Sequence, residues 1–74
     1  MNDHTTFLAA GAGELLAPSE AAKRTGLKEA TLAQMRCRGD GPAFHKIARF
    51  VRYDSVDLER WMRSRRFRST SEAR

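Results

Sequence analysis

The sequence predicts a mostly α-helical fold with a small β-hairpin, arranged as a winged helix-turn-helix. Three observations predict it. A helical segment led by Pro18 is followed, across Gly26, by a second helical segment. Residues 44–53 are basic and rich in β-forming side chains, and an amphipathic segment containing Trp61 comes last. This order allows the second helix and the hairpin each to reach a groove of DNA.

The first helix is expected to begin at Pro18, because proline has no N–H to lose in a first helical turn. Ala17 precedes it without a hydroxyl to cap the start, so the start is weaker or moves to Ser19. Residues 21–24 continue the helix. Gly26 supplies the turn, since glycine is free to adopt a positive φ.

The second helix follows Lys28, and Glu29 places a carboxylate in its first turn. One face is apolar and should pack on the first helix; it carries Leu27, Thr31, Leu32 and Met35. The opposite face and its flanks form the candidate recognition surface, made of Lys28, Glu29, Ala30, Ala33, Gln34, Arg36, Cys37 and Arg38. Residues 39–42, Gly-Asp-Gly-Pro, end the helix.

The chemistry of this surface suits base edges in a major groove. Gln34 can pair bidentately with adenine, and Glu29 can accept from cytosine. Ala30 and Ala33 can meet thymine methyl groups. Because arginine is scarce among the central positions, we expect modest base discrimination. The competing interpretation is a helix face that is merely exposed to solvent.

Residues 44–53 predict a hairpin with a turn near Ala48 and Arg49. Alternation places Val51 and Tyr53 on the inward face. The wing cations are Lys46, Arg49 and Arg52, which suit the phosphate backbone or the minor groove. Phe50 is interpreted either as a wedge or as a cover for the hairpin, and we favour the cover.

The last helix is expected to begin after Asp54, whose carboxylate can cap it, with Asp57 completing an acidic variant of the capping box. Its core contacts are Val56, Leu58, Trp61 and Met62, and Trp61 is interpreted as a core anchor. The cations that follow are candidates for contacts with phosphate or with another subunit: Arg63, Arg65, Arg66 and Arg68. The expected division is a flexible arm over 1–13, the DNA-binding domain over 14–66 and a basic, polar tail over 67–74.

Composition narrows the function classes. With 74 residues the chain is expected to form one domain, without a separate catalytic or effector domain. The net charge of +5 favours a polyanionic partner, with a solvated basic face as the alternative. No catalytic arrangement, phosphate loop or metal-ligand spacing is present, and Cys37 stands alone. We expect no enzyme activity, cofactor, metal, small-molecule ligand or membrane partner, and a cytoplasmic location.

The segment from Leu15 to Met62 resembles the excisionase and AlpA-like family of MerR-type DNA-binding domains. The resemblance is carried by the order of its short signals, including Thr25-Gly26-Leu27, Gly39-Asp40-Gly41-Pro42 and the Leu58-Glu59-Arg60-Trp61 spacing. It departs from the family at Ala17 and Lys28, where a capping Ser or Thr is common, and at Ala48 and Arg49, where glycine is common. These departures leave the turn type of the wing open.

The resemblance implies a bacterial recombination directionality factor associated with the nucleoid. Such proteins bind duplex DNA cooperatively and head to tail beside an attachment site, bend it, and direct an integrase, here expected to be of the tyrosine type, to excision. An AlpA-like or small MerR-like transcriptional regulator is the alternative. The alternative of another class is a phage assembly or interaction module, such as a terminase-small-subunit-like domain.

Overall fold

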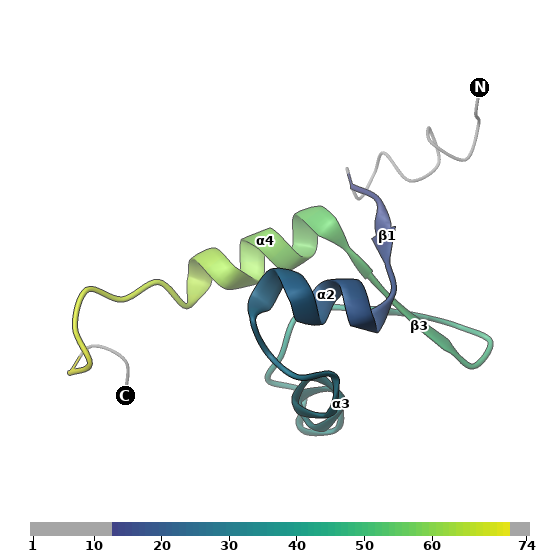
Figure 1. Ribbon diagram of the computed structural model, residues 1–74, viewed down its shortest axis with the longest axis horizontal. Helices are drawn as coiled ribbons and strands as arrows, with labels where there is room; N and C mark the ends of the chain where they lie inside the picture. Colours follow the sequence, from purple (N-terminus) through teal and green to yellow (C-terminus); the bar gives the residue numbers. More distant parts are fainter. Residues whose placement is uncertain (1–12, 72–74) are drawn as a thin grey trace.

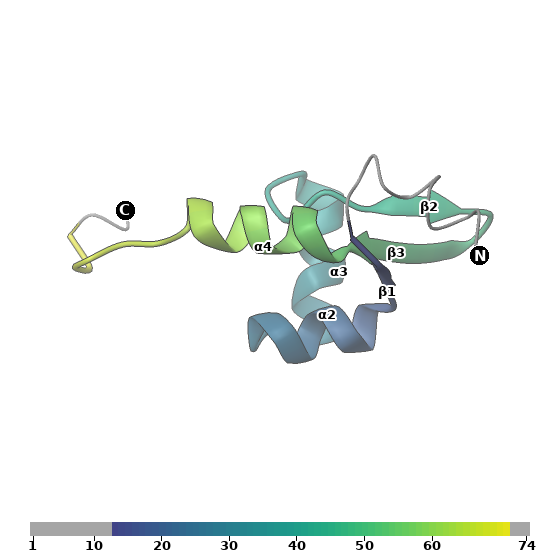
Figure 2. The ribbon, with the colours of Figure 1, turned by 90° about the horizontal axis from the view of Figure 1, so that it is seen from above.

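The computed structural model describes residues 13–71 and shows a winged helix-turn-helix (Figure 1). In chain order its elements are β1 (Leu15–Leu16), α2 (Pro18–Thr25), α3 (Glu29–Arg38), β2 (His45–Ile47), β3 (Phe50–Asp54) and α4 (Ser55–Ser64). The β2–β3 hairpin projects from one end of the helical body, and the chain beyond α4 extends from the other (Figure 2). The predicted N-terminal arm lies, apart from Gly13, outside the described residues.

The α2–α3 turn forms as the sequence predicts. Pro18 stands in the first turn of α2, and Ala17 gives no side-chain cap. Gly26 ends the helix in the left-handed region with a φ of 77°, and its N–H donates to the carbonyl of Ala22. The hydroxyl of Thr25 donates to the carbonyl of Ala21 at 2.9 Å and accepts from the N–H of Leu27 at 3.2 Å. These bonds fix the angle at which the chain enters α3.

The three strands form an antiparallel sheet in the order β1–β3–β2. β1 is a strand that the sequence analysis does not predict. Its residues Leu15 and Leu16 pair with Asp54 and Tyr53. The pairing joins the start of the domain to the strand that leads into α4.

The core takes one buried side chain from each element except β2: Leu16, Ala21, Leu32, Tyr53 and Leu58. Tyr53 is the largest of them and is 0% exposed. Val51 packs partly buried against this core, so the predicted inward face of β3 is confirmed. All three residues of β2 are exposed, which leaves the outer part of the hairpin beyond the core.

The hairpin closes through a two-residue turn. Ile47 pairs with Phe50, which leaves Ala48 and Arg49 as the turn residues. Ala48 has a φ of 56°, and it is the single non-glycine residue with a positive φ in the described part of the chain. A positive φ at the first turn position alone is typical of a type II′ turn, where glycine is the preferred residue. An L-alanine there is strained.

The start of α4 is capped as predicted. The Asp54 carboxylate accepts from the N–H of Val56 at 2.8 Å and from that of Asp57 at 3.1 Å. Asp57 pairs instead with Arg60 at 3.6 Å, so the second half of a capping box does not form among the described contacts.

The apolar residues of α4 are buried less than predicted. Leu58 is 1% exposed, but Met62 is 39% exposed and lies outside the core. Trp61 is half-buried, with the Arg65 guanidinium 5.2 Å from its ring centroid. Trp61 is therefore less buried than its interpretation as a core anchor predicts. From residue 13 to residue 71, no helix has both the length and the apolar character needed to cross a bilayer.

Candidate nucleic-acid interface

The outer face of α3 is largely exposed to solvent. Leu32 is fully buried on the inner face, while Leu27 and Met35 pack partly buried beside it. Because one side of the helix is held this way, the other side faces solvent (Figure 1). The exposed residues include Lys28, Glu29, Ala30, Gln34 and Cys37, with Ala33 half-buried.

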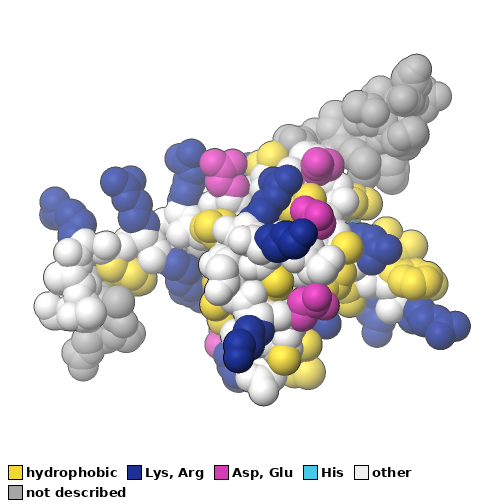
Figure 3. Space-filling model, viewed as in Figure 1, with side chains coloured by type: hydrophobic (Ala, Val, Ile, Leu, Met, Phe, Trp, Pro, Cys, Tyr) yellow, Lys and Arg dark blue, Asp and Glu magenta, His cyan; other side chains and the backbone are white. Residues whose placement is uncertain are grey.

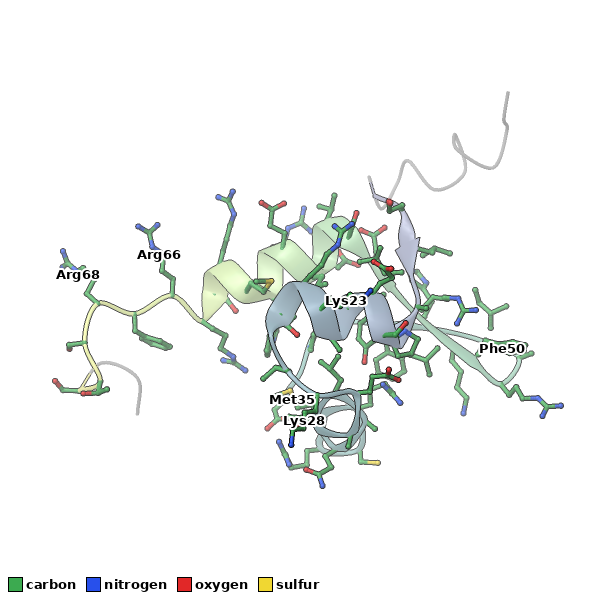
Figure 4. The ribbon with its side chains drawn as sticks, viewed as in Figure 1. Lys23, Lys28, Met35, Phe50, Arg66 and Arg68 are labelled. Atoms are coloured by element: carbon green, nitrogen blue, oxygen red, sulfur yellow. The ribbon has the colours of Figure 1, made fainter. Side chains whose placement is uncertain are left out.

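These residues coincide with most of the recognition surface derived from the sequence. Lys28 is the residue before α3, with a ψ of 152° and no side-chain cap. Figure 4 shows its side chain at the near end of α3, at the lower edge of the view. The structure thus brings the predicted readers together on one surface; their contacts with bases stay a prediction.

Arg36 has a contact that the sequence analysis misses. Its Nη1 donates to the hydroxyl of Tyr53 at 2.7 Å, and its guanidinium lies 5.8 Å from the centroid of the Phe44 ring. The Phe44 and Tyr53 rings are 6.3 Å apart and tilted by 55°. Arg36 therefore connects α3 to the base of the hairpin. The signal in the sequence is the single tyrosine on the predicted inward face, whose buried hydroxyl needs a polar partner.

Arg38, at the end of α3, pairs with Asp40 at 3.1 Å, and both side chains are about half exposed. A pair this exposed contributes little to stability. The guanidinium can therefore exchange Asp40 for a phosphate at small cost.

The three wing cations differ in their contacts. Arg52 donates to the carbonyl of Val51 at 2.7 Å and lies 5.5 Å from the centroid of the Phe50 ring. Lys46 and Arg49 are exposed and have no hydrogen bond or ion pair with any residue from 13 to 71. Of the predicted wing contacts, these two are the most available to an anion.

The basic residues at the end of α4 lie partly on the helix and partly on the chain that follows it. Arg63 pairs with Glu59 at 3.2 Å. Arg65 donates to the carbonyl of Asp40 at 2.9 Å, which ties the end of α4 to the loop after α3. Arg66 and Arg68 are exposed and follow α4 along the extended chain (Figure 4).

Charge is distributed unevenly over the surface. In the face shown in Figure 3, basic side chains occupy both ends, over the hairpin and along the segment after α4. Acidic side chains lie in the middle, interleaved with other basic ones. No group of three or more His, Cys, Asp or Glu side chains within residues 13–71 is placed to hold a metal ion.

A helix pair joined by a glycine turn, followed by a hairpin with free cations, defines a DNA-binding domain of the helix-turn-helix class. Comparison with known families agrees: residues 15–66 match the helix-turn-helix domain family. The match spans more than half of the chain, and the protein belongs to this family. No curated protein gives a significant match.

Proposed function

We propose that the protein is an excisionase, a recombination directionality factor of a bacterial mobile element. It binds duplex DNA at repeated sites beside an attachment site, bends the DNA and directs a tyrosine-type integrase to excision. It does not cut DNA itself. It acts in the cytoplasm, on the nucleoid.

The proposal is supported by two features seen together. The exposed face of α3 has few side chains that can read bases, and the hairpin carries basic side chains that are not paired within the described part of the domain. The exposed face of α3 offers Gln34 and Glu29 as its polar readers, beside two alanines. Lys46 and Arg49 are available for backbone contacts, which give affinity without sequence information. A domain of this kind binds DNA readily but selects one site poorly.

Several copies on adjacent sites remove this weakness, because they add contacts and share the cost of bending. We therefore assign the protein a head-to-tail arrangement on DNA, with a weak contact between neighbouring copies. The basic residues after α4, Arg66 and Arg68, extend from the end opposite the hairpin (Figure 4). They suit a contact with the next copy or with the phosphates between two sites.

The test compares one-site, three-site and scrambled duplexes of a native repeat in gel-shift titrations, with sedimentation of the free protein. We expect a monomer in solution and cooperative loading on the three-site duplex. Adding the integrase and an attachment-site substrate should then give excision that depends on this protein. Independent binding at the three sites, or a stable two-fold dimer, contradicts the assembly.

The same experiment separates the other candidates. Cooperative binding at a promoter with no effect on excision identifies a transcriptional regulator. Absence of binding to every duplex at low salt contradicts DNA binding and favours a protein-interaction module of the terminase type.

A further inference from the structure

The tip of the hairpin exposes two large apolar side chains. Ile47 and Phe50 are 52% and 55% exposed, and they are directly opposite each other in the β2–β3 ladder. Residues opposite each other in a ladder point to the same face, so the two side chains form one patch. Figure 4 places Phe50 near the tip, away from the helices. Phe50 therefore lies outside the core.

The patch has a basic rim. Arg49 stands in the turn beside Phe50, whereas Lys46 pairs with Val51 and so points to the opposite face of the hairpin. The Arg52 guanidinium lies over the Phe50 ring, 5.5 Å from its centroid. A partner that fits this surface is apolar at its centre and anionic around it. A base step of duplex DNA, with stacked apolar base faces between two phosphate backbones, has that chemistry.

We propose that Ile47 and Phe50 form a wedge that enters a base step from the minor groove while the rim cations hold the flanking phosphates. The inference rests on the proposed function, and it names the residues that kink the DNA. Minor-groove proteins insert apolar side chains in this way and bend the duplex by roughly 20–90°. Pyrimidine–purine steps unstack most easily, so the wedge selects such a step without a hydrogen bond to a base edge.

A second copy of the chain is the competing occupant of the patch. A stable protein interface buries about 800 Å² on each partner, and an aromatic side chain supplies only about 150–250 Å². The patch consists of two side chains, and its cations would need an acidic counterpart. Size and charge both favour DNA.

The experiment measures the bend of an end-labelled duplex by energy transfer, with the full chain saturating one native site. Phe50→Ala removes the wedge, and Phe67→Ala is the matched control, because Phe67 is 46% exposed but lies outside the sheet. We expect the wild type and the control to bend the duplex equally, and Phe50→Ala to lose at least half of the angle. Ile47→Ser should reduce the bend in the same direction, and circular dichroism checks that each variant is folded.

A second readout uses a mismatch at the kinked step, which lowers the cost of unstacking. The wild type should bind the mismatched duplex about tenfold more tightly than the matched one. Phe50→Ala should lose this preference.

Three outcomes overturn the wedge. An unchanged bend for folded Phe50→Ala and Ile47→Ser refutes it and leaves DNA binding intact. Loss of cooperativity on a three-site duplex with an unchanged single-site bend assigns the patch to a second copy. Failure of the wild type itself to bind any duplex refutes the proposed function together with the wedge.

Discussion

The contact between Arg36 and Tyr53 sets how the wing stands relative to α3, and its contribution to stability can be measured. The perturbation is a double-mutant cycle of Tyr53→Phe, Arg36→Met and both together. Phenylalanine keeps the buried ring beside Phe44 and removes the hydroxyl, and methionine keeps an apolar stem without the donors.

The magnitude follows from the geometry. The bond is 2.7 Å long, and its donor is charged. Hydrogen bonds to charged groups contribute roughly 1.5–3 kcal/mol net to stability. Because Arg36 is only half-buried, we take the lower value, about 1.5 kcal/mol. For a domain of this size such a loss lowers Tm by about 6–12 °C.

The assay is urea unfolding of the full chain, followed by circular dichroism, for the wild type and the three variants. Tyr53→Phe should shift the midpoint with an unchanged m-value. The double variant should be about 1 kcal/mol more stable than the sum of the single losses predicts. Losses that add within about 0.5 kcal/mol would show that the two side chains act independently, and the reasoning would fail.

Three further changes test single features. Asp54→Ala should lower the unfolding free energy by about 1–2 kcal/mol, because two N–H groups of α4 lose their cap. Asp54→Asn should retain most of the wild-type stability, and an Asn variant as unstable as the Ala variant would argue against the capping role. Ala48→Gly should raise the unfolding free energy by about 0.5–1 kcal/mol, because relief of the positive φ exceeds the entropy that glycine costs. A lower urea midpoint would contradict the strain. Gln34→Ala should reduce the difference in binding free energy between the preferred base and the others at one position by about 1–3 kcal/mol, measured by competition gel shifts on single-substitution duplexes. An equal loss of affinity on every duplex would show that Gln34 does not read a base.

Local signals in the sequence were enough to predict much of the fold. Gly26 forms the turn, Asp54 caps the last helix and Val51 points inward, because each depends on residues close to it in the chain. β1 was missed because two leucines show no periodicity, and their strand exists only through pairing with distant β3. The contact of Arg36 with Tyr53 was missed for the same reason, since the two residues are separated along the chain.

The candidate interface was predictable in its helix and less so in its wing. Helical spacing alone separates the buried Leu32 from the exposed Gln34. Which cations are free depends in part on tertiary contacts, since Arg65 reaches the carbonyl of Asp40. The exposure of Phe50 likewise depends on how far the hairpin extends beyond the core.

The most direct test of the DNA-binding surface is the salt dependence of duplex binding for the wild type, Arg49→Ala and Arg60→Ala. Arg60 is the matched control, because its removal takes away the same charge from α4, where it is paired with Asp57. The logarithm of the binding constant should fall steeply and linearly with the logarithm of salt concentration for the wild type. Arg49→Ala should weaken binding on all sequences and reduce the slope by about one, while Arg60→Ala leaves the slope unchanged. Equal slopes for the wild type and Arg49→Ala would contradict the wing as a phosphate contact.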